Sequence, residues 1–352
     1  YRFKPKTATL SDDVLKSVYK NDYISLSVSR MERFSKCPFS YYLNYILNVK
    51  EQKKSMLYST DTGSIMHDVI EKISVSIKNS GFDWSNVSTD FLTTETERLV
   101  NEKIAEVGAM FGFLSNRRTW LLIRLKSTLM TSVKFIAEHL RASEFVPLGY
   151  EIEFANGNKY TPFKITIGGK TVSLKGKIDR ADMYTDAEGN RFIRVIDYKS
   201  GSRSFDVSNM YYGLELQLMV YLDRLCDLEN ASPAGILYFR FKDPILEEGK
   251  GRIEDEFKMK GLVLKNDDVI RAMDKNFDRK SNVIPVEYKI DGNHTVHSSV
   301  ASANQFAGMR KHLHTVIRQI GKEIAKGRTD ISPIRTSSVN GCEYCNFRQA
   351  CL

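Results

Sequence analysis

The stretch Phe192-Ile-Arg-Val-Ile-Asp-Tyr-Lys199 decides the fold class of this chain of 352 residues and places its chemistry. Its first five residues are almost entirely apolar, which predicts a buried strand near the centre of a sheet. Asp197 and Lys199 follow at the end of that strand, and their spacing of two puts both side chains on the same side of the sheet. The stretch therefore predicts a central strand that ends in an acid and a base.

The residues around this stretch predict a mixed sheet with helices. Four further segments have the pattern of strands: 150–154, 163–167, 172–174 and 234–241. Gly168-Gly169 lies between the second and third of them, which is a good hairpin signal. Residues 212–226 are expected to form a helix. Pairs of strands followed by a helix and another strand are typical of the α/β class.

Helical patterns stand on both sides of this sheet region. They run from 62 to 142 with a loop near 80–88, and again from 302 to 326, where one long apolar face ends before Gly327. Ser29 and Glu32 have capping-box spacing, so a helix is expected to start there and to stop at Pro38. A second helix is expected directly after Cys37, and residues 246–299 are expected to be loop-rich.

These patterns predict one large domain with a short leading arm. We expect an arm or linker over 1–24 and a single domain over 25–352. Within it we expect a mainly helical region at 62–145, an α/β core at 146–245, and a C-terminal helix with clustered cysteines at 300–352.

Composition bounds the partners and the compartment. The formal net charge is +9 and the pI is about 9.1, which favours a polyanionic partner. A merely basic surface is the alternative. The sequence has no apolar run long enough for a membrane span and no signal-peptide pattern, so we expect a soluble, cytoplasmic protein with no membrane partner.

A second acid accompanies the deciding stretch. Asp179 ends the preceding strand candidate, after Gly176. If the two strands pair, Asp179, Asp197 and Lys199 converge at one edge of the sheet. Carboxylates suit Mg2+ or Mn2+, and a lysine beside them can hold an attacking water and offset charge on a scissile phosphate. The alternative is a set of ion pairs at strand ends.

Three more residues carry candidate chemistry. His67, in Gly63-Ser-Ile-Met-His67, lies on a helix-like segment and could ligate Mn2+ or, less often, Mg2+. A structural histidine is the alternative. Gln217 and Tyr221 are four apart and share a helix face, where they could present an amide and a phenol to a phosphate or a base.

The cysteines suggest a metal centre. Cys342, Cys345 and Cys351 form a Cys-x2-Cys-x5-Cys pattern, and thiolates at such spacing are typical metal ligands. If Cys37 is the fourth ligand, the centre joins the two ends of the chain. Cys226 is expected to be a buried helix residue. From the cysteines alone, a Zn2+ ion and an iron–sulfur cluster both stay open.

Taken in chain order, these residues resemble the motifs of the PD-(D/E)XK nucleases of the RecB family. The matching segments are Gly63–His67, Asp179, Asp197-Tyr-Lys199 and Gln217–Tyr221. The resemblance implies a restriction-endonuclease-like sheet flanked by helices, Mg2+ bound by His67, Asp179 and Asp197, and a catalytic role for Lys199. Aspartate fills the second acidic position, which is a frequent form. Glu151 or Glu153 is the candidate for a supporting acid.

The cysteine segments resemble the C-terminal nuclease region of the AddB family, subunits of bacterial AddAB helicase–nucleases. The matching segments are Ser27–Phe39, Pro233–Phe239 and the final cysteine pattern. The resemblance implies a [4Fe–4S] cluster on Cys37, Cys342, Cys345 and Cys351, a helicase-like region before residue 1 and an AddA-like partner. It also implies single-stranded DNA as substrate. The 5′-ended strand would be cut, 5′→3′, by a metal-activated water during processing of double-strand breaks.

Two other functions stay open at this point. The fold could guide a DNA strand without cutting it, which fits the basic charge and the cysteines equally well. Small CRISPR-associated iron–sulfur nucleases also have one early cysteine and three late ones, although they are usually much shorter. A complete set of two acids and a lysine favours an enzyme over a guide.

Overall fold

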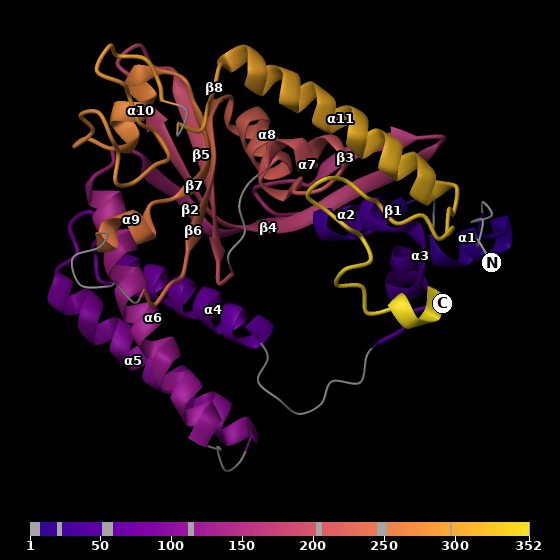
Figure 1. Ribbon diagram of the computed structural model, residues 1–352, viewed down its shortest axis with the longest axis horizontal. Coiled ribbons are helices and arrows are strands. Elements are labelled where there is room, and N and C mark those ends of the chain that lie inside the picture. The colour runs from indigo at the N-terminus through magenta and orange to yellow at the C-terminus, as the bar shows by residue number, and fades with distance from the viewer. Residues whose placement is uncertain are drawn as a thin grey trace.

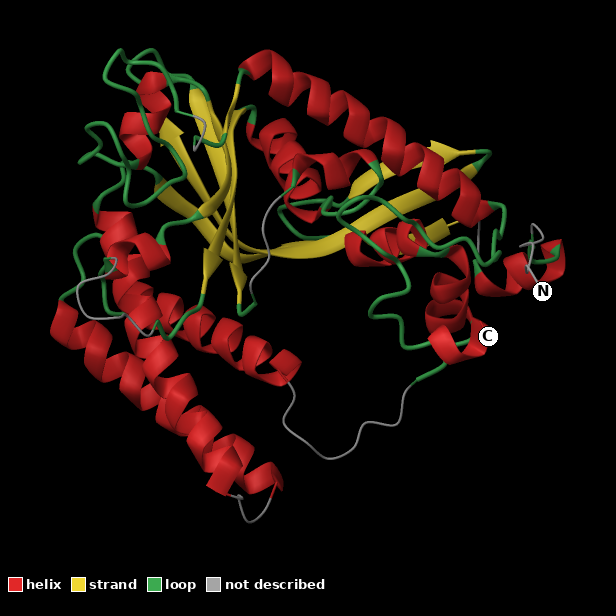
Figure 2. Ribbon diagram, in the orientation of Figure 1, coloured by secondary structure: helices red, strands yellow, loops and turns green. Residues whose placement is uncertain are grey.

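The computed structural model describes residues 8–19, 23–50, 59–111, 116–201, 206–244, 252–295 and 298–351. Over these ranges the strands form a central layer with helices on both sides (Figures 1 and 2). The predicted α/β class with a mixed sheet is confirmed. None of the helices in these ranges is both long enough and apolar enough to cross a membrane.

The described residues contain one sheet with the strand order β1-β4-β5-β6-β7-β8, in which β2 and β3 also pair with β4. The strands are β1 (Tyr23–Ser27), β2 (Val146–Phe154), β3 (Phe163–Ile167), β4 (Lys170–Thr185), β5 (Arg191–Lys199), β6 (Ser232–Arg240), β7 (Lys260–Leu264) and β8 (Val300–Ala301). β5 lies between β4 and a parallel β6. The central position predicted for its apolar residues is therefore confirmed.

β4 is the long strand that links the two halves of the sheet. Its first part pairs with β1 and β3, and its second part pairs with β2 and β5. Gly176 lies where the partners change, and a Cβ at this position would lie 1.8 Å from the hydroxyl oxygen of Tyr221. The strand is much longer than the predicted 172–174, so Asp179 lies inside it and not at its end.

The helices are α1 (Asp12–Val18), α2 (Val28–Lys36), α3 (Pro38–Tyr41), α4 (Ser59–Asn79), α5 (Thr89–Phe111), α6 (Asn116–Arg141), α7 (Val207–Tyr211), α8 (Gln217–Glu229), α9 (Ile253–Phe257), α10 (Asp267–Met273) and α11 (Ala303–Ala325), with a π-helical turn η2 (Tyr42–Ile46) and a 3-10 turn η3 (Arg348–Cys351). α8 packs on β5 and β6, and α11 runs over α8. α4, α5 and α6 form a separate helical layer on the other side of the sheet (Figure 1). This layer is the helical region predicted at 62–142.

Two predicted helix boundaries are wrong. The N-cap of α2 is Ser27, whose hydroxyl accepts from the Arg30 amide, because β1 runs directly into the helix. Ser29 therefore lies inside the first turn. The helix predicted at 212–226 begins only at Gln217, since Gly213 and Glu215 take positive φ angles of 76° and 53° in a turn after α7.

Two segments are more ordered than the sequence predicted. In the expected arm, α1 forms over 12–18 and Tyr23 begins β1, while residues 1–7 and 20–22 lie outside the described part. The expected loop region at 246–299 contains α9, β7 and α10. β7 forms because it pairs with β6, a long-range contact that no local pattern encodes. The capping box that starts α11 is formed by Ser302 and Gln305.

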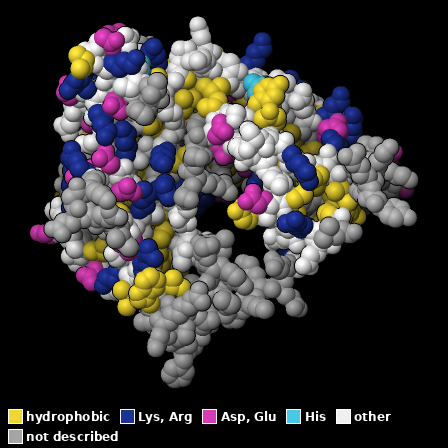
Figure 3. Space-filling model, in the orientation of Figure 1, with side chains coloured by type: hydrophobic (Ala, Val, Ile, Leu, Met, Phe, Trp, Pro, Cys, Tyr) yellow, Lys and Arg dark blue, Asp and Glu magenta, His cyan; other side chains and the backbone are white. Residues whose placement is uncertain are grey.

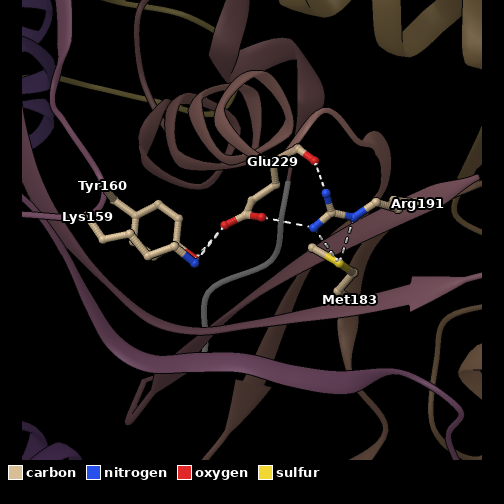
Figure 4. Close-up of polar contacts among 5 residues, drawn as sticks. All are labelled: Lys159, Tyr160, Met183, Arg191 and Glu229. Carbon is tan, nitrogen blue, oxygen red and sulfur yellow. Dashed lines mark hydrogen bonds and ion pairs between the residues drawn. The ribbon is translucent and has the colours of Figure 1, made fainter.

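Glu229 anchors the C-terminal end of α8 to the sheet (Figure 4). Its carboxylate accepts from the Tyr160 hydroxyl at 2.8 Å and from Arg191 Nη2 at 2.9 Å. The Arg191 guanidinium also donates to the Glu229 carbonyl oxygen and contacts the sulfur of Met183 on β4. Lys159 adds an ion pair at 3.0 Å, but this side chain is largely exposed. The partly buried arginine therefore holds α8 in register with β4 and β5.

Asp182 is fully buried on β4 between two arginines. It accepts from Arg180 Nε at 2.7 Å and Nη2 at 2.6 Å, and from Arg194 Nε at 2.9 Å. Burial, followed by these two positive charges, lowers the pKa of the neighbouring His139 to about 3, so this imidazole stays neutral. Asp182 is thus the charge that compensates two guanidinium groups beneath the β4–β5 ladder.

We expect Asp182→Asn to lower the free energy of unfolding by about 3–5 kcal/mol, because it leaves two buried arginines without a counter-charge. Urea denaturation monitored by circular dichroism measures the loss. Asp186→Asn, in the exposed turn between β4 and β5, is the matched control and should stay within about 1 kcal/mol of the parent. Equal losses in the two variants would contradict the role of the buried charge.

Candidate functional site

The site forms where the ladder between β4 and β5 ends. The last paired residues are Arg180 and Ile196, so Asp179 and Asp197 are the next facing positions in this antiparallel register. At this point the Tyr198 amide donates to Asp179 Oδ2 at 2.6 Å. The side chain of Asp179 thus takes a backbone donor of β5, and the two acids stand at facing positions of neighbouring strands.

Two further residues approach Asp179 from other elements. His67, on α4, has its Nδ1 3.2 Å from Asp179 Oδ1 and 3.9 Å from Glu151 Oε1. The ligand atoms of His67, Glu151 and Asp179 all lie within 4.8 Å of one another. An imidazole and two carboxylates at this spacing fit a divalent cation such as Mn2+ or Mg2+.

Glu151 reaches the site through an irregularity of β2. It faces Asp179, between the pairs Tyr150–Arg180 and Ile152–Ile178, and its φ is +49°. The register of β2 also shifts just before it, between Pro147 and Gly149. A left-handed backbone is uncommon for a residue other than glycine, and bulges of this kind redirect side chains.

The structure distinguishes the two glutamates that the sequence left open. Glu151 is 11% exposed and lies in the site. Glu153 is exposed and accepts from the Asn158 side chain instead. No local pattern separates the two, because they have the same side chain and lie on the same face of a regular strand. The bulge decides which one faces Asp179.

Asp197 and Lys199 are in direct contact, with Lys199 Nζ 2.5 Å from Asp197 Oδ2. Asp197 is only 4% exposed. Burial and the charge of Asp179 raise the pKa of Asp197. Burial alone would lower the pKa of His67, but its hydrogen bonds to Asp179 and Glu151 outweigh this and raise the pKa to about 10. The site therefore concentrates negative charge that a cation can neutralise.

A cleft of about 540 Å³ opens beside these residues. It is lined by charged and small side chains: Gly63, Ser64, His67, Asp68, Glu71, Glu151, Lys177, Tyr198, Lys199 and Ser200. A Cβ at Gly63 would lie 3.2 Å from the Ser200 hydroxyl, so the glycine permits a close approach of α4 to the end of β5. Lys177 is a cleft residue that the sequence analysis missed, although its spacing of two from Asp179 was a usable signal.

Gln217 and Tyr221 have different positions. Gln217 begins α8 and lines a small hollow together with Asp197, Lys199 and Glu32. Tyr221 is buried, and its ring is stacked on Phe154 with centroids 5.1 Å apart. Its hydroxyl reaches β4 in the space left by the missing side chain of Gly176. Tyr221 thus touches the strand that carries Asp179, whereas Gln217 lies beside the acids.

The four predicted cysteine ligands lie at the junction of the two chain ends. Cys37 is buried between α2 and α3. The Ile334 amide donates to the Lys36 carbonyl oxygen, and the Phe39 amide donates to that of Asp330. Burial, followed by the charges of Cys37, Cys345 and Cys342, raises the pKa of Cys351, so the four sulfurs are neighbours. Figure 1 shows the C-terminal turn close to α3.

The spacing of these sulfurs is informative about the metal. A tetrahedral zinc ion with Zn–S bonds of about 2.3 Å holds its thiolates about 3.8 Å apart. Among the described residues, no three of the cysteine sulfurs lie within 4.8 Å of one another. A cluster binds each thiolate to a different iron and so tolerates a wider set. Cys226 lies elsewhere, on α8, and burial raises its pKa to about 12.

We expect Glu151→Gln to weaken Mn2+ binding by about tenfold or more, because one of the three facing ligands loses its charge. Isothermal titration with Mn2+ measures this affinity. Glu153→Gln, two residues away on the same strand, removes an equal charge outside the site and should leave Mn2+ binding unchanged. Equal affinities in the two variants would show that the strained residue is not a ligand.

Comparison with known proteins connects this geometry to a family. The sequence model of the PD-(D/E)XK nuclease superfamily matches residues 25–352. Similar curated proteins are named as one subunit, the AddB type, of an ATP-dependent helicase/deoxyribonuclease. The protein from Acetivibrio thermocellus is 34% identical over 367 residues, which cover 100% of this chain and 32% of that protein. The one from Clostridium novyi is 36% identical and covers 97% and 31%, and the one from Clostridium acetobutylicum is 36% identical and covers 93% and 30%. The chain thus spans about a third of the length of these relatives.

Proposed function

The chain belongs to the PD-(D/E)XK nuclease superfamily, and on this premise we propose that it is a Mg2+-dependent deoxyribonuclease that hydrolyses single-stranded DNA. The observation that carries the proposal is the convergence at the end of the β4–β5 ladder. There Asp179 and Asp197 face each other, and Lys199 contacts Asp197. His67 closes the site from α4.

Each residue has a separate role in this proposal. His67, Asp179 and Asp197 hold the cation, with Glu151 as a further ligand on the side of β2. A bound divalent ion supplies Lewis-acid chemistry and lowers the pKa of water. Lys199 keeps its ammonium at the edge of the cleft, where it orients the attacking water and offsets charge on the phosphate. Gln217 lines the hollow behind Lys199 and orients groups there, and Tyr221 supports β4.

The wider role is proposed from the relatives. Their name describes one subunit of a helicase and deoxyribonuclease. We propose that this chain works in a bacterial, cytoplasmic complex with an AddA-like partner and cuts the 5′-ended strand, 5′→3′, at double-strand breaks. Dark blue Lys and Arg side chains gather on the left of the face shown in Figure 3, consistent with a polyanionic partner. End-labelled duplexes unwound by the complex would show which strand is cut.

We also propose that the four cysteines hold a [4Fe–4S] cluster that joins the chain ends as a structural staple. The wide sulfur spacing supports a cluster over a single zinc ion. Visible absorption and iron content of anaerobically purified protein test the assignment. A colourless protein that contains zinc would overturn it.

The alternative of a strand-guiding module has a direct test. A guide without catalysis has no use for the complete set of Asp179, Asp197 and Lys199 around an open cleft. Mg2+-dependent degradation of a labelled oligonucleotide by the purified protein would exclude a pure guide, whereas tight binding without cleavage would favour it.

A further inference from the structure

We propose that Lys177 is a second phosphate-binding residue of the cleft, and that it contacts the backbone of the bound single strand on the opposite side of the acids from Lys199. The inference rests on the proposed nuclease function and adds a substrate contact to it. Lys177 lies outside the motif residues discussed above and is identified by its register and surroundings.

The register of β4 and β5 places two lysines symmetrically. Continued past its last pair, this antiparallel register sets Lys177 opposite Lys199, just as it sets Asp179 opposite Asp197. Each strand therefore carries an acid and, two residues further from the ladder, a lysine. The spacing of two keeps each lysine on the same face of its strand as the acid. The acids are thus flanked by one ammonium on each strand.

Both lysines border the same open cleft. Lys177 is 49% exposed and Lys199 is 28% exposed, so each can reach a ligand from solvent. A strand whose scissile phosphate lies at the acids would run between two cations, and phosphate contacts by lysine position a nucleic acid backbone without reading its sequence. The cleft therefore has the charge pattern of a site for a polyphosphate backbone.

The ion pairs of Lys177 suggest a second, purely local role that has to be separated. Its ammonium lies 2.7 Å from Glu151 Oε2 and 3.7 Å from Glu71 Oε2. Burial would lower the pKa of Lys177, but the hydrogen bond and charge of Glu151 raise it, so the side chain is charged at neutral pH. If Lys177 only compensates Glu151, its removal changes metal binding and not the salt dependence of DNA binding.

The test uses Lys177→Gln in the purified protein with a fluorescent oligothymidylate as probe. Binding is measured by anisotropy over a series of KCl concentrations without Mg2+, and cleavage is measured with Mg2+. We expect Lys177→Gln to bind roughly three- to tenfold more weakly and to lower the slope of log K against log salt by about 0.7, the value for one phosphate contact on a single strand. Lys177→Arg should restore both quantities.

Lys175→Gln is the matched control, because Lys175 is exposed on the same strand, two residues away and outside the cleft lining. An unchanged salt slope in Lys177→Gln, or an equal change in Lys175→Gln, overturns the proposal. A changed Mg2+ requirement with an unchanged slope assigns Lys177 to Glu151 alone and also overturns it. If the parent protein binds the probe but never cuts it with Mg2+, the nuclease function fails, and the salt slopes still decide the role of Lys177.

Discussion

Replacing Asp197 by alanine is expected to lower the rate of Mg2+-dependent cleavage by at least about a thousandfold, because the loss of charge stabilisation by the bound ion is worth several kcal/mol. Asp197 is the acid between Asp179 and Lys199, and the variant removes both a proposed ligand and the partner that holds the lysine. Single-turnover degradation of a labelled oligonucleotide in excess Mg2+ measures the loss.

The same variant should not unfold the protein. Burial and the charge of Asp179 raise the pKa of Asp197 in the folded state, so its ionised form is less favourable there than in the unfolded chain. At neutral pH, removal of this charge is therefore expected to leave the free energy of unfolding unchanged or to raise it slightly. Asp197→Asn retains the shape and should behave alike in both measurements, and Asp186→Ala is the control that keeps full activity. Equal cleavage by Asp197→Ala and the parent would refute the proposed site.

Cys342→Ala is expected to destabilise the C-terminal tail by an amount on the order of 5 kcal/mol, because the free energy of binding a structural metal is largely folding free energy. Among the described residues after 328, only Asp330 is buried, so the tail lacks an apolar core of its own. Backbone bonds near Lys36 and Phe39 are the main contacts that remain. Without the metal centre, residues 328–351 should detach from α2 and α3.

Hydrogen exchange over residues 328–351, together with the melting temperature and the visible absorption, measures this loss. The tail should lose protection first, and DNA binding should weaken even though the cysteines lie away from the acids. Cys226→Ala is the matched control, since Cys226 is buried on α8, away from the four proposed ligands. It should retain iron and an attached tail. An unchanged melting temperature in Cys342→Ala would contradict the role of the cluster as a staple.

Much of the fold could be predicted because it is written in local periodicity. The apolar run before Asp197 predicted a central strand, and Gly168-Gly169 predicted the hairpin between β3 and β4. The helical regions followed in the same way. Local patterns failed where pairing between distant segments overrides them. β1 and β7 form because β4 and β6 offer edges to pair with, and α2 starts at Ser27 because β1 precedes it.

The sequence by itself determined the types and spacings of the chemical groups: an acid and a lysine two apart at the end of a strand, a second acid on the preceding strand, a histidine on a helix and four cysteines at the two ends. Tertiary structure alone decided which of these groups meet and at what distance. The bulge at Glu151 chose this glutamate over Glu153, and the continued register placed Lys177 opposite Lys199. The physical reason is that side-chain direction along a strand follows local backbone geometry, whereas the partner across the sheet depends on a register set by long-range packing.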